Sequence, residues 1–208
     1  MSSVSRPSLP VSRLVLASAS PRRSEILRSL GIPFAVRAVD VPEFPLPGET
    51  AETAAARLAA DKAAVAAERD PDSWVLAADT LVFLDGRILG KPRDDGEAAE
   101  MLRMLSGHEH GVVTAVRLRR GESPGAGIAE VSRVRFAPMT EEEIAWYAAT
   151  GEPRDKAGAY GVQGFGARFI QEIHGSFTNV MGLPARGVYE LLRACPDPAV
   201  SSLALSSG

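Results

Sequence analysis

The sequence predicts an α/β fold in one domain, and three observations carry this prediction. At 208 residues the chain fits a single domain that can bury a core without disulfides. Residues 14–31 have the pattern of a strand, a loop and a helix. Strand-like and helix-like periods are mixed along the rest of the chain, with no internal repeat or linker. We therefore expect a disordered leader over 1–12, one domain over 13–194 and a loose tail over 195–208.

Composition and charge exclude several classes of protein. The formal net charge of −3 gives no general attraction to a nucleic-acid backbone or an anionic membrane. No apolar run approaches the roughly 18 residues of a membrane span, and the Ser/Pro-rich leader lacks the apolar stretch of a signal peptide. The single cysteine, Cys195, cannot form an internal disulfide and fits a reducing cytosol. We expect a cytoplasmic protein with neither a nucleic-acid nor a membrane partner.

The first unit begins with the short apolar run Leu14–Ala17, which is typical of a buried strand. A helix follows, because apolar residues recur at helical spacing until Gly31. Pro21 suits its first turn, where a missing N–H costs nothing, and Ser20 is a good N-cap.

The next segments predict a strand over 34–41, a proline-rich loop over 42–49 and an alanine-rich helix over about 50–69. Lys62 falls on or beside the apolar stripe of that helix. Spacing alone favours a lysine that extends from the edge of the core into solvent over one with a functional role.

Residues 74–92 read as two strands around the Asp85-Gly86 turn, a dipeptide typical of a tight hairpin. Asp79 and Thr80 interrupt the first apolar run. This carboxylate lies either at the end of the strand or in the interior, where an unpaired charge is costly. A helix over 94–107 follows.

Two period-two segments, 110–120 and 129–139, predict an antiparallel hairpin. Thr140 and Glu143 have capping-box spacing and start a short helix. The stretch 152–169 is glycine-rich and has no period, and so long a loop in a compact domain is usually functional. A strand and a closing helix complete the chain before the tail.

The loop from Ser18 to Arg23 lies between a strand and a helix N-terminus, where unpaired N–H groups and the helix dipole favour an anion. Arg22 and Arg23 are unfavourable at the positive end of a dipole unless an anion lies among them. Two solvated arginines explain the pattern equally well. The loop is neither a Walker motif nor a dinucleotide GxGxxG. His108 and His110 lie two apart and are expected to share a strand face; we expect them to have structural or surface roles and not to bind zinc.

Hydrolysis of a phosphoanhydride needs cations, a divalent metal and a carboxylate that orients or deprotonates water. Asp79 is the best-placed carboxylate, and Glu43 is a loop carboxylate. The cations in or beside suspected loops are Arg22, Arg23, Lys62, Lys91 and Lys156.

Five motifs in order, "LASASPRRSEIL", "ADTLV" with "GRILGKP", "MLRMLSGHEHGVVTAV", "DKAGAYGVQG" and "HGSFTNVMGLP", resemble the signatures of the Maf family of nucleoside triphosphate pyrophosphatases. The resemblance runs from about Leu14 to Leu192. It implies hydrolysis between the α- and β-phosphates, giving a monophosphate and pyrophosphate with a divalent cation, Mg or Mn. It also implies an elongated mixed sheet with flanking helices, two lobes around a central cleft as in inosine-triphosphatase-like folds, and a homodimer.

The resemblance also assigns roles to residues of this chain. Asp79 matches the family's proton acceptor, and Arg23 matches a position tied to substrate choice. Glu43 and Asp79 are the candidate metal ligands. The positions that match substrate-binding or cleft-lining residues are Ser18, Arg22, Arg23, Lys62, Thr80, Lys91 and Gln163.

The glycine-rich motif "DKAGAYGVQG" resembles the branch of the family that acts on dTTP and UTP. The Gln163 amide carries both a donor and an acceptor, which can pair with the O4/N3 edge of uracil or thymine. Two alternatives remain open: an inosine- or xanthosine-type purine triphosphate pyrophosphatase, and a non-catalytic nucleotide-binding regulator of septum formation. Binding alone would not require a carboxylate beside the phosphates, which disfavours the regulator.

Overall fold

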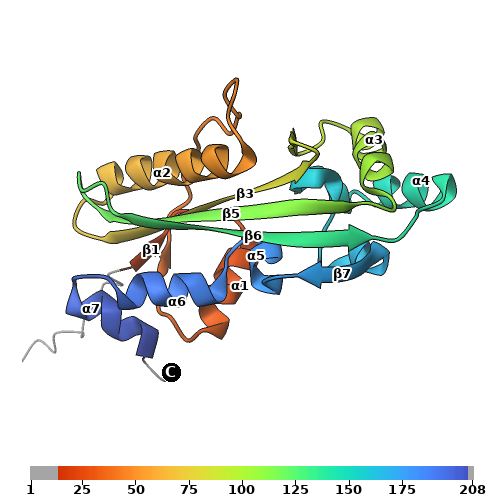
Figure 1. Cartoon of the computed structure of the whole chain (residues 1–208). Coiled ribbons are helices and arrows are strands. Elements are labelled where there is room, and N and C mark those ends of the chain that lie inside the picture. The colour runs from red at the N-terminus through yellow and green to blue at the C-terminus, as the bar shows by residue number, and fades with distance from the viewer. Residues whose placement is uncertain (1–13, 206–208) are drawn as a thin grey trace, which may run out of the picture.

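The computed structural model describes residues 14–205, so the expected leader over 1–12 lies outside the described residues. The chain forms a seven-stranded sheet with the order β2-β1-β3-β5-β6-β7, and β4 pairs with β3. β1 is parallel to β2 and β3, whereas the other pairs are antiparallel. The long strands β3, β5 and β6 run the length of the molecule (Figure 1). The sheet is therefore mixed and the molecule elongated, which confirms the expected α/β fold.

Most predicted elements form where expected. The strands are β1 (Leu14–Leu16), β2 (Ala35–Val36), β3 (Trp74–Leu84), β4 (Arg87–Leu89), β5 (Glu109–Arg120), β6 (Ala126–Phe136) and β7 (Ile170–His174). The α-helices are α1 (Pro21–Ser29), α2 (Ala51–Arg69), α3 (Asp95–Leu105), α4 (Glu141–Ala149), α5 (Phe177–Met181), α6 (Ala185–Arg193) and α7 (Pro198–Ser201). Short 3-10 helices are η1 (Glu152–Asp155), η2 (Ala157–Ala159), η3 (Gly164–Phe169) and η4 (Ser202–Leu205).

The strand predicted over 34–41 is much shorter than expected, because β2 covers two residues. Its only partner strand in the described sheet is β1, and β1 ends at Leu16. The last backbone bond between these segments joins Arg37 N–H to Leu16 O. Beyond this point the chain has no neighbouring strand to pair with, and it continues as the proline-rich loop.

Helices cover both faces of the sheet and divide the core. α2 lies on one face, whereas α1, α6 and α7 lie on the other (Figure 1). The alanines of α2 pack against β3 and β5, and this small-residue contact places the helix close to the sheet. A further cluster joins α3 and α4 to the glycine-rich segment at the opposite end of the sheet. The two-lobed arrangement is therefore present.

The tail differs from the prediction. Within the segment expected to be loose, residues 198–205 form α7 and η4, and Val200 is fully buried in the core cluster that includes residues of α6. Asp197 caps α7, and its carboxylate accepts a hydrogen bond from Trp74 Nε1 at 3.1 Å. Sequence reasoning missed this segment because its few apolar residues, Cys195, Val200, Leu203 and Ala204, pack against a core cluster that forms only when distant segments come together.

None of the helices in residues 14–205 is long and apolar enough to cross a membrane.

Candidate active site

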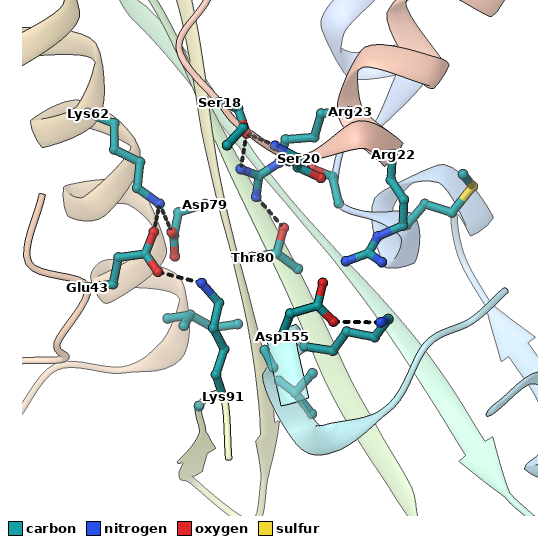
Figure 2. A pocket seen from close by; sticks show the side chains of 18 of the residues that line it. Ser18, Ser20, Arg22, Arg23, Glu43, Lys62, Asp79, Thr80, Lys91 and Asp155 are labelled. Carbon is teal, nitrogen blue, oxygen red and sulfur yellow. Dashed lines mark hydrogen bonds and ion pairs between the residues drawn. The ribbon is translucent and has the colours of Figure 1, made fainter. Parts of the chain in front are cut away.

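A cleft of about 1020 Å³ lies between the two lobes (Figure 2). It collects segments that are far apart in the sequence, including the loop after β1, the proline-rich loop, the middle of β3 and the glycine-rich segment. The lining comprises residues 17–23, 39–45, 79–82, 90–91, 155–157, 160–162 and 180–182, with Lys62 and Val112. All but one of the expected site residues line it.

The exception is Gln163. Its side chain is exposed, and it lies outside the residues that line the cleft, although its neighbour Val162 is among them. Lys156, named from the sequence as a cation but not among the expected substrate-binding residues, does line the cleft, and so does Asp155, which was not a candidate. The signal for both was present, because they begin the motif "DKAGAYGVQG" that carries Gln163.

The loop after β1 is built around the Ser18 hydroxyl. This oxygen accepts hydrogen bonds from Ser20 N–H at 3.2 Å and from Arg23 Nη1 at 3.1 Å. Ser20 occupies the N-cap position of α1 as predicted, with Pro21 in the first turn, but the Ser20 side chain makes no capping bond to the described residues. The first-turn N–H groups beside the cleft are therefore left for an anion.

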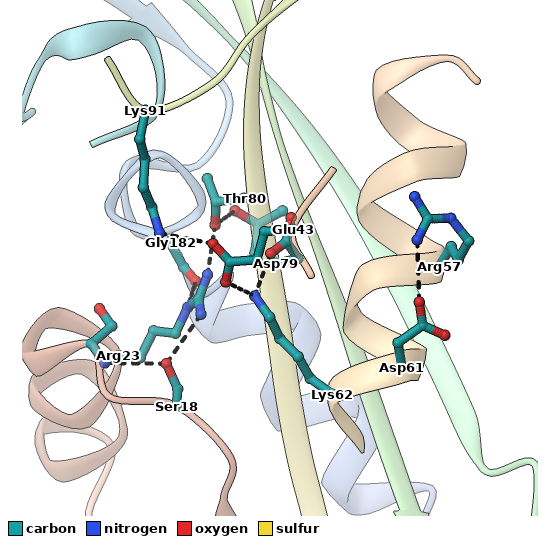
Figure 3. Close-up of polar contacts among 12 residues, drawn as sticks. Ser18, Arg23, Glu43, Arg57, Asp61, Lys62, Asp79, Thr80, Lys91 and Gly182 are labelled. Carbon is teal, nitrogen blue, oxygen red and sulfur yellow. Dashed lines mark hydrogen bonds and ion pairs between the residues drawn. The ribbon is translucent and has the colours of Figure 1, made fainter. Parts of the chain in front are cut away.

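Arg23 is held on three sides. Its guanidinium donates from Nε to Gly182 O at 2.8 Å, from Nη1 to Ser18 and from Nη2 to Thr80 Oγ1 at 3.1 Å (Figure 3). Burial lowers the pKa of Arg23, while the negative charges of Asp79 and Glu43 oppose this shift. Arg23 is thus a fixed cation that ties the loop after β1 to β3 and to the end of α5.

A chain of hydroxyls sets the direction of these bonds. Thr114 donates its only hydroxyl hydrogen to Asn179 O at 2.9 Å. In its contact with Thr114, also 2.9 Å long, the Thr80 hydroxyl must therefore be the donor. Thr80 is then an acceptor toward Arg23, so every hydrogen in this relay has a partner.

Arg22 lines the same cleft and is half-buried, and it takes no part in the contacts that hold Arg23 (Figure 2). The two adjacent arginines therefore differ. Arg23 is fixed by protein groups, whereas Arg22 presents its charge to the cleft near Asp155. Neither fits the alternative of two fully solvated arginines.

Four charged side chains alternate in sign across the cleft floor. Lys62 Nζ lies 2.6 Å from Asp79 Oδ1 and 2.6 Å from Glu43 Oε1. Glu43 Oε2 in turn lies 2.8 Å from Lys91 Nζ (Figure 3). Spacing along the helix favoured a lysine that extends into bulk solvent. That prediction is wrong, because only 6% of Lys62 is exposed.

Asp79 lies in the middle of β3 and not at its end, and 5% of it is exposed. Because successive side chains of a strand point to opposite faces, Asp79 meets Lys62 of α2 while Thr80 meets Arg23 on the other side. Burial raises the pKa of Asp79, although Lys62 and Arg23 oppose the rise. A carboxylate with a raised pKa is a stronger base than a solvated one.

Glu43 behaves in the opposite way. Burial alone would raise its pKa, but hydrogen bonds from Lys62 and Lys91 lower it to about 2. Glu43 is therefore ionised throughout the neutral range, and it holds the two lysines at the cleft.

Residues 14–205 contain no group of three or more His, Cys, Asp or Glu side chains that could hold a metal ion. Two carboxylates do converge, since Glu43 and Asp79 both reach the Nζ of Lys62. Mg²⁺ is commonly bound by one or two carboxylates together with substrate phosphates and water. The donor set therefore fits a cation that is completed by a phosphate ligand.

The two histidines do not share a strand face as expected. His108 precedes β5 and is exposed, whereas His110 is 1% exposed. His110 Nε2 lies 2.8 Å from the hydroxyl of Tyr160, which lines the cleft. His110 thus supports a wall of the cleft from behind.

Several known proteins are similar in sequence to this chain. The family model described as "Maf-like protein" matches residues 13–195. A dTTP/UTP pyrophosphatase from Geobacter sulfurreducens is 50% identical over 87% of this chain and 95% of its own length. One from Methylococcus capsulatus is 52% identical over 87% and 90%, respectively. Among solved structures, the Ham1 protein of Staphylococcus aureus matches with a TM-score of 0.46 and 18% identity, covering 76% of this chain and 79% of that one. The chain belongs to the Maf family.

Proposed function

We propose that this protein hydrolyses dTTP and UTP to the monophosphate and pyrophosphate. The observation that carries the proposal is the buried carboxylate Asp79, which lies on the floor of a cation-lined cleft between Lys62 and the Arg23–Thr80 contact. The names of the Geobacter and Methylococcus relatives support the choice of substrate. A cleft of this size accommodates a nucleotide, because ligand pockets commonly measure about 300–1,000 Å³.

The triphosphate binds against the loop after β1, where the first turn of α1 and Arg22 meet its charge. Lys91 adds charge from the opposite side of the cleft. Asp79 accepts a proton from water as the water oxygen attacks the α-phosphorus. The bond from that phosphorus to the bridging oxygen breaks, and pyrophosphate leaves. Arg23 keeps the loop in place while the charge shifts.

We include a divalent cation, Mg or Mn, in this proposal, with Glu43 and Asp79 as its protein ligands. When bound, such an ion would neutralise the negative charge that develops on the phosphate oxygens during hydrolysis. Glu43 is suited to this role because its carboxylate stays ionised.

Three further expectations belong to the same proposal. The pairing of Gln163 with a pyrimidine requires its exposed side chain to turn toward the cleft when a nucleotide binds. The homodimer implied by the family is tested by sedimentation of the purified chain. The lone cysteine supports a cytoplasmic location, where thiols stay reduced.

The proposal is tested by pyrophosphate release from dTTP, UTP, dITP and XTP, with Asp79→Asn compared against Asp72→Asn. Asp72 is exposed in the turn before β3 and serves as the matched control. We expect Asp79→Asn to lose about 10²- to 10⁴-fold in kcat, as for the loss of a general base. Nucleotide binding should persist, and the control should match the wild type. An active Asp79→Asn protein contradicts the assignment, and a preference for dITP or XTP contradicts the pyrimidine substrate.

A further inference from the structure

One wall of the cleft is a loop, residues 156–166, that has little regular structure of its own. Lys156, Tyr160, Gly161 and Val162 from this loop line the cleft. Its regular structure consists of short 3-10 turns, which do not hold a loop in place by themselves. Contacts with other parts of the chain must therefore determine the conformation of this wall.

A single carboxylate, that of Glu152, makes several of these contacts. Its Oε2 accepts the backbone N–H of Phe165 at 2.8 Å, and its Oε1 accepts that of Gly166 at 3.0 Å. The backbone carbonyl of Glu152 also accepts a hydrogen bond from Lys156 Nζ at 2.7 Å. Both ends of the loop are therefore fastened to one residue of η1.

The phenol of Tyr147 on α4 fastens the middle of the loop. Its hydroxyl donates to Glu152 Oε1 at 2.8 Å and accepts the N–H of Gly161 at 3.0 Å. Tyr147 is fully buried, so its ring cannot leave this position without opening the core cluster that joins α3, α4 and the glycine-rich segment. We call Tyr147 and Glu152 the loop clamp.

The loop clamp also explains two glycines of this segment, Gly164 and Gly166. A Cβ on Gly166 would lie 2.5 Å from the Tyr147 hydroxyl, and one on Gly164 would lie 2.6 Å from Glu152 Oε2. Gly164 in addition has a φ of +82°, which favours glycine. A side chain at either position would therefore have to displace Glu152 or Tyr147 from these contacts, and at Gly166 it would also meet the backbone oxygen of Gly161 at 2.5 Å.

The charge states make the direction of these bonds definite. Burial of Glu152 opposes its ionisation, but the N–H donors of Phe165 and Gly166 together with Tyr147 and Lys156 hold its pKa below the usual value. Burial raises the pKa of Tyr147. At neutral pH a carboxylate thus accepts and a neutral phenol donates, and hydrogen bonds to a charged acceptor are the stronger kind.

We propose that the loop clamp of Tyr147 and Glu152 positions the substrate-facing wall of the cleft, and so determines nucleotide affinity and the choice of base without taking part in the hydrolytic step. The kinetic part of this inference rests on the proposed function. Tyr147 and Glu152 are positioning residues, because they act through Lys156, Tyr160, Gly161 and the neighbouring backbone and do not line the cleft themselves.

The test compares Glu152→Gln and Tyr147→Phe with the controls Glu142→Gln and Tyr189→Phe. Glu142 is exposed on α4, and the Tyr189 hydroxyl contacts Arg193 on α6, away from the cleft. Tyr147→Phe removes one oxygen and keeps the buried ring, so it remains informative if Glu152→Gln does not fold. In each clamp variant we expect KM for dTTP and UTP to rise about tenfold with kcat within about threefold, the signature of lost binding that the ground state and the transition state share equally.

A second measurement does not depend on catalysis. Hydrogen exchange of the peptide covering residues 156–169, without nucleotide, should become at least about tenfold faster in the clamp variants, because local opening becomes easier. The controls should leave both measurements unchanged.

The outcomes separate the two proposals. A wild-type protein that releases no pyrophosphate contradicts the proposed function, while the exchange experiment still tests the loop clamp. Unchanged exchange overturns the clamp. Faster exchange with an unchanged KM and an unchanged ratio of dTTP to dITP turnover overturns its role in positioning the wall, as does a fall in kcat alone.

Discussion

Removal of the Lys62 charge is the sharpest test of how the cleft floor is held together. Lys62→Met keeps an unbranched, apolar stem of similar length at this buried position of α2 while it deletes the ammonium. Both Asp79 Oδ1 and Glu43 Oε1, each 2.6 Å from Nζ, then lose this partner.

The magnitude follows from the exposure of the two carboxylates. The Glu43 side chain is 41% exposed and keeps Lys91, so water and that lysine compensate it. The Asp79 side chain is 7% exposed and is left as a buried charge. Breaking a buried pair in this way costs about 3–5 kcal/mol. We expect the lower value, about 3 kcal/mol, because Arg23 still acts on Asp79. For a chain of this length, this corresponds to a loss of roughly 6–12 °C in Tm.

The effect depends on pH with a definite sign. The pKa of Asp79 is already raised in the folded protein, and loss of Lys62 raises it further. The folded state then binds the proton more tightly than the unfolded state, so its stability falls as the pH rises. The deficit of Lys62→Met relative to the wild type should be largest at pH 8 and should shrink toward pH 5.

Urea unfolding at pH 8 and pH 5 measures this, with Lys91→Met as the matched control. The Lys91 side chain is 56% exposed and pairs with Glu43 alone among the described residues, so its loss should cost about 0.5 kcal/mol. The double variant Lys62→Met/Asp79→Asn should recover most of the lost stability. A Lys62→Met protein that unfolds with the same free energy as Lys91→Met at pH 8, or a deficit that does not shrink at pH 5, would refute the reasoning.

Two further outcomes follow from the same network. Arg23→Lys should lower the free energy of unfolding by about 2 kcal/mol. The compact ammonium of lysine cannot reach Gly182, Ser18 and Thr80 at once, and hydrogen bonds from charged donors contribute about 1.5–3 kcal/mol each. An unchanged midpoint of urea unfolding would contradict this. Burial lowers the pKa of His110 to about 4, so an NMR titration should find its ring neutral down to about pH 5, and its contribution to stability should be lost as the pH falls below the unfolded value near 6.5. A His110 midpoint near 6.5 would contradict its buried contact with Tyr160.

Several parts of the fold were predictable because their causes are local. The hairpin of β5 and β6 follows from period-two alternation, and α4 begins at the predicted capping box of Thr140 and Glu143. The short β2 and the ordered tail were not predictable. The length of β2 depends on how far β1 extends beside it, and the order of the tail depends on the apolar cluster that it covers.

The candidate site divides in the same way. The order of the motifs identified the candidate residues, and their types, carboxylates, lysines and arginines beside loops, indicated the chemistry. Spacing along α2 could not show that Lys62 meets Asp79, since the two lie 17 residues apart and come together only where α2 crosses β3. It also could not distinguish Arg22 from Arg23, because the groups that hold Arg23 come from β3 and from the end of α5.

By itself, the sequence determined the α/β class, the family and the set of charged residues, because periodicity, caps and motifs are properties of neighbouring positions. The tertiary structure alone decided which charge is buried, which lysine pairs with which carboxylate, and that Tyr147 and Glu152 hold the glycine-rich wall. These depend on distances and on exclusion of water, and both arise only when segments from opposite ends of the chain pack around one cleft.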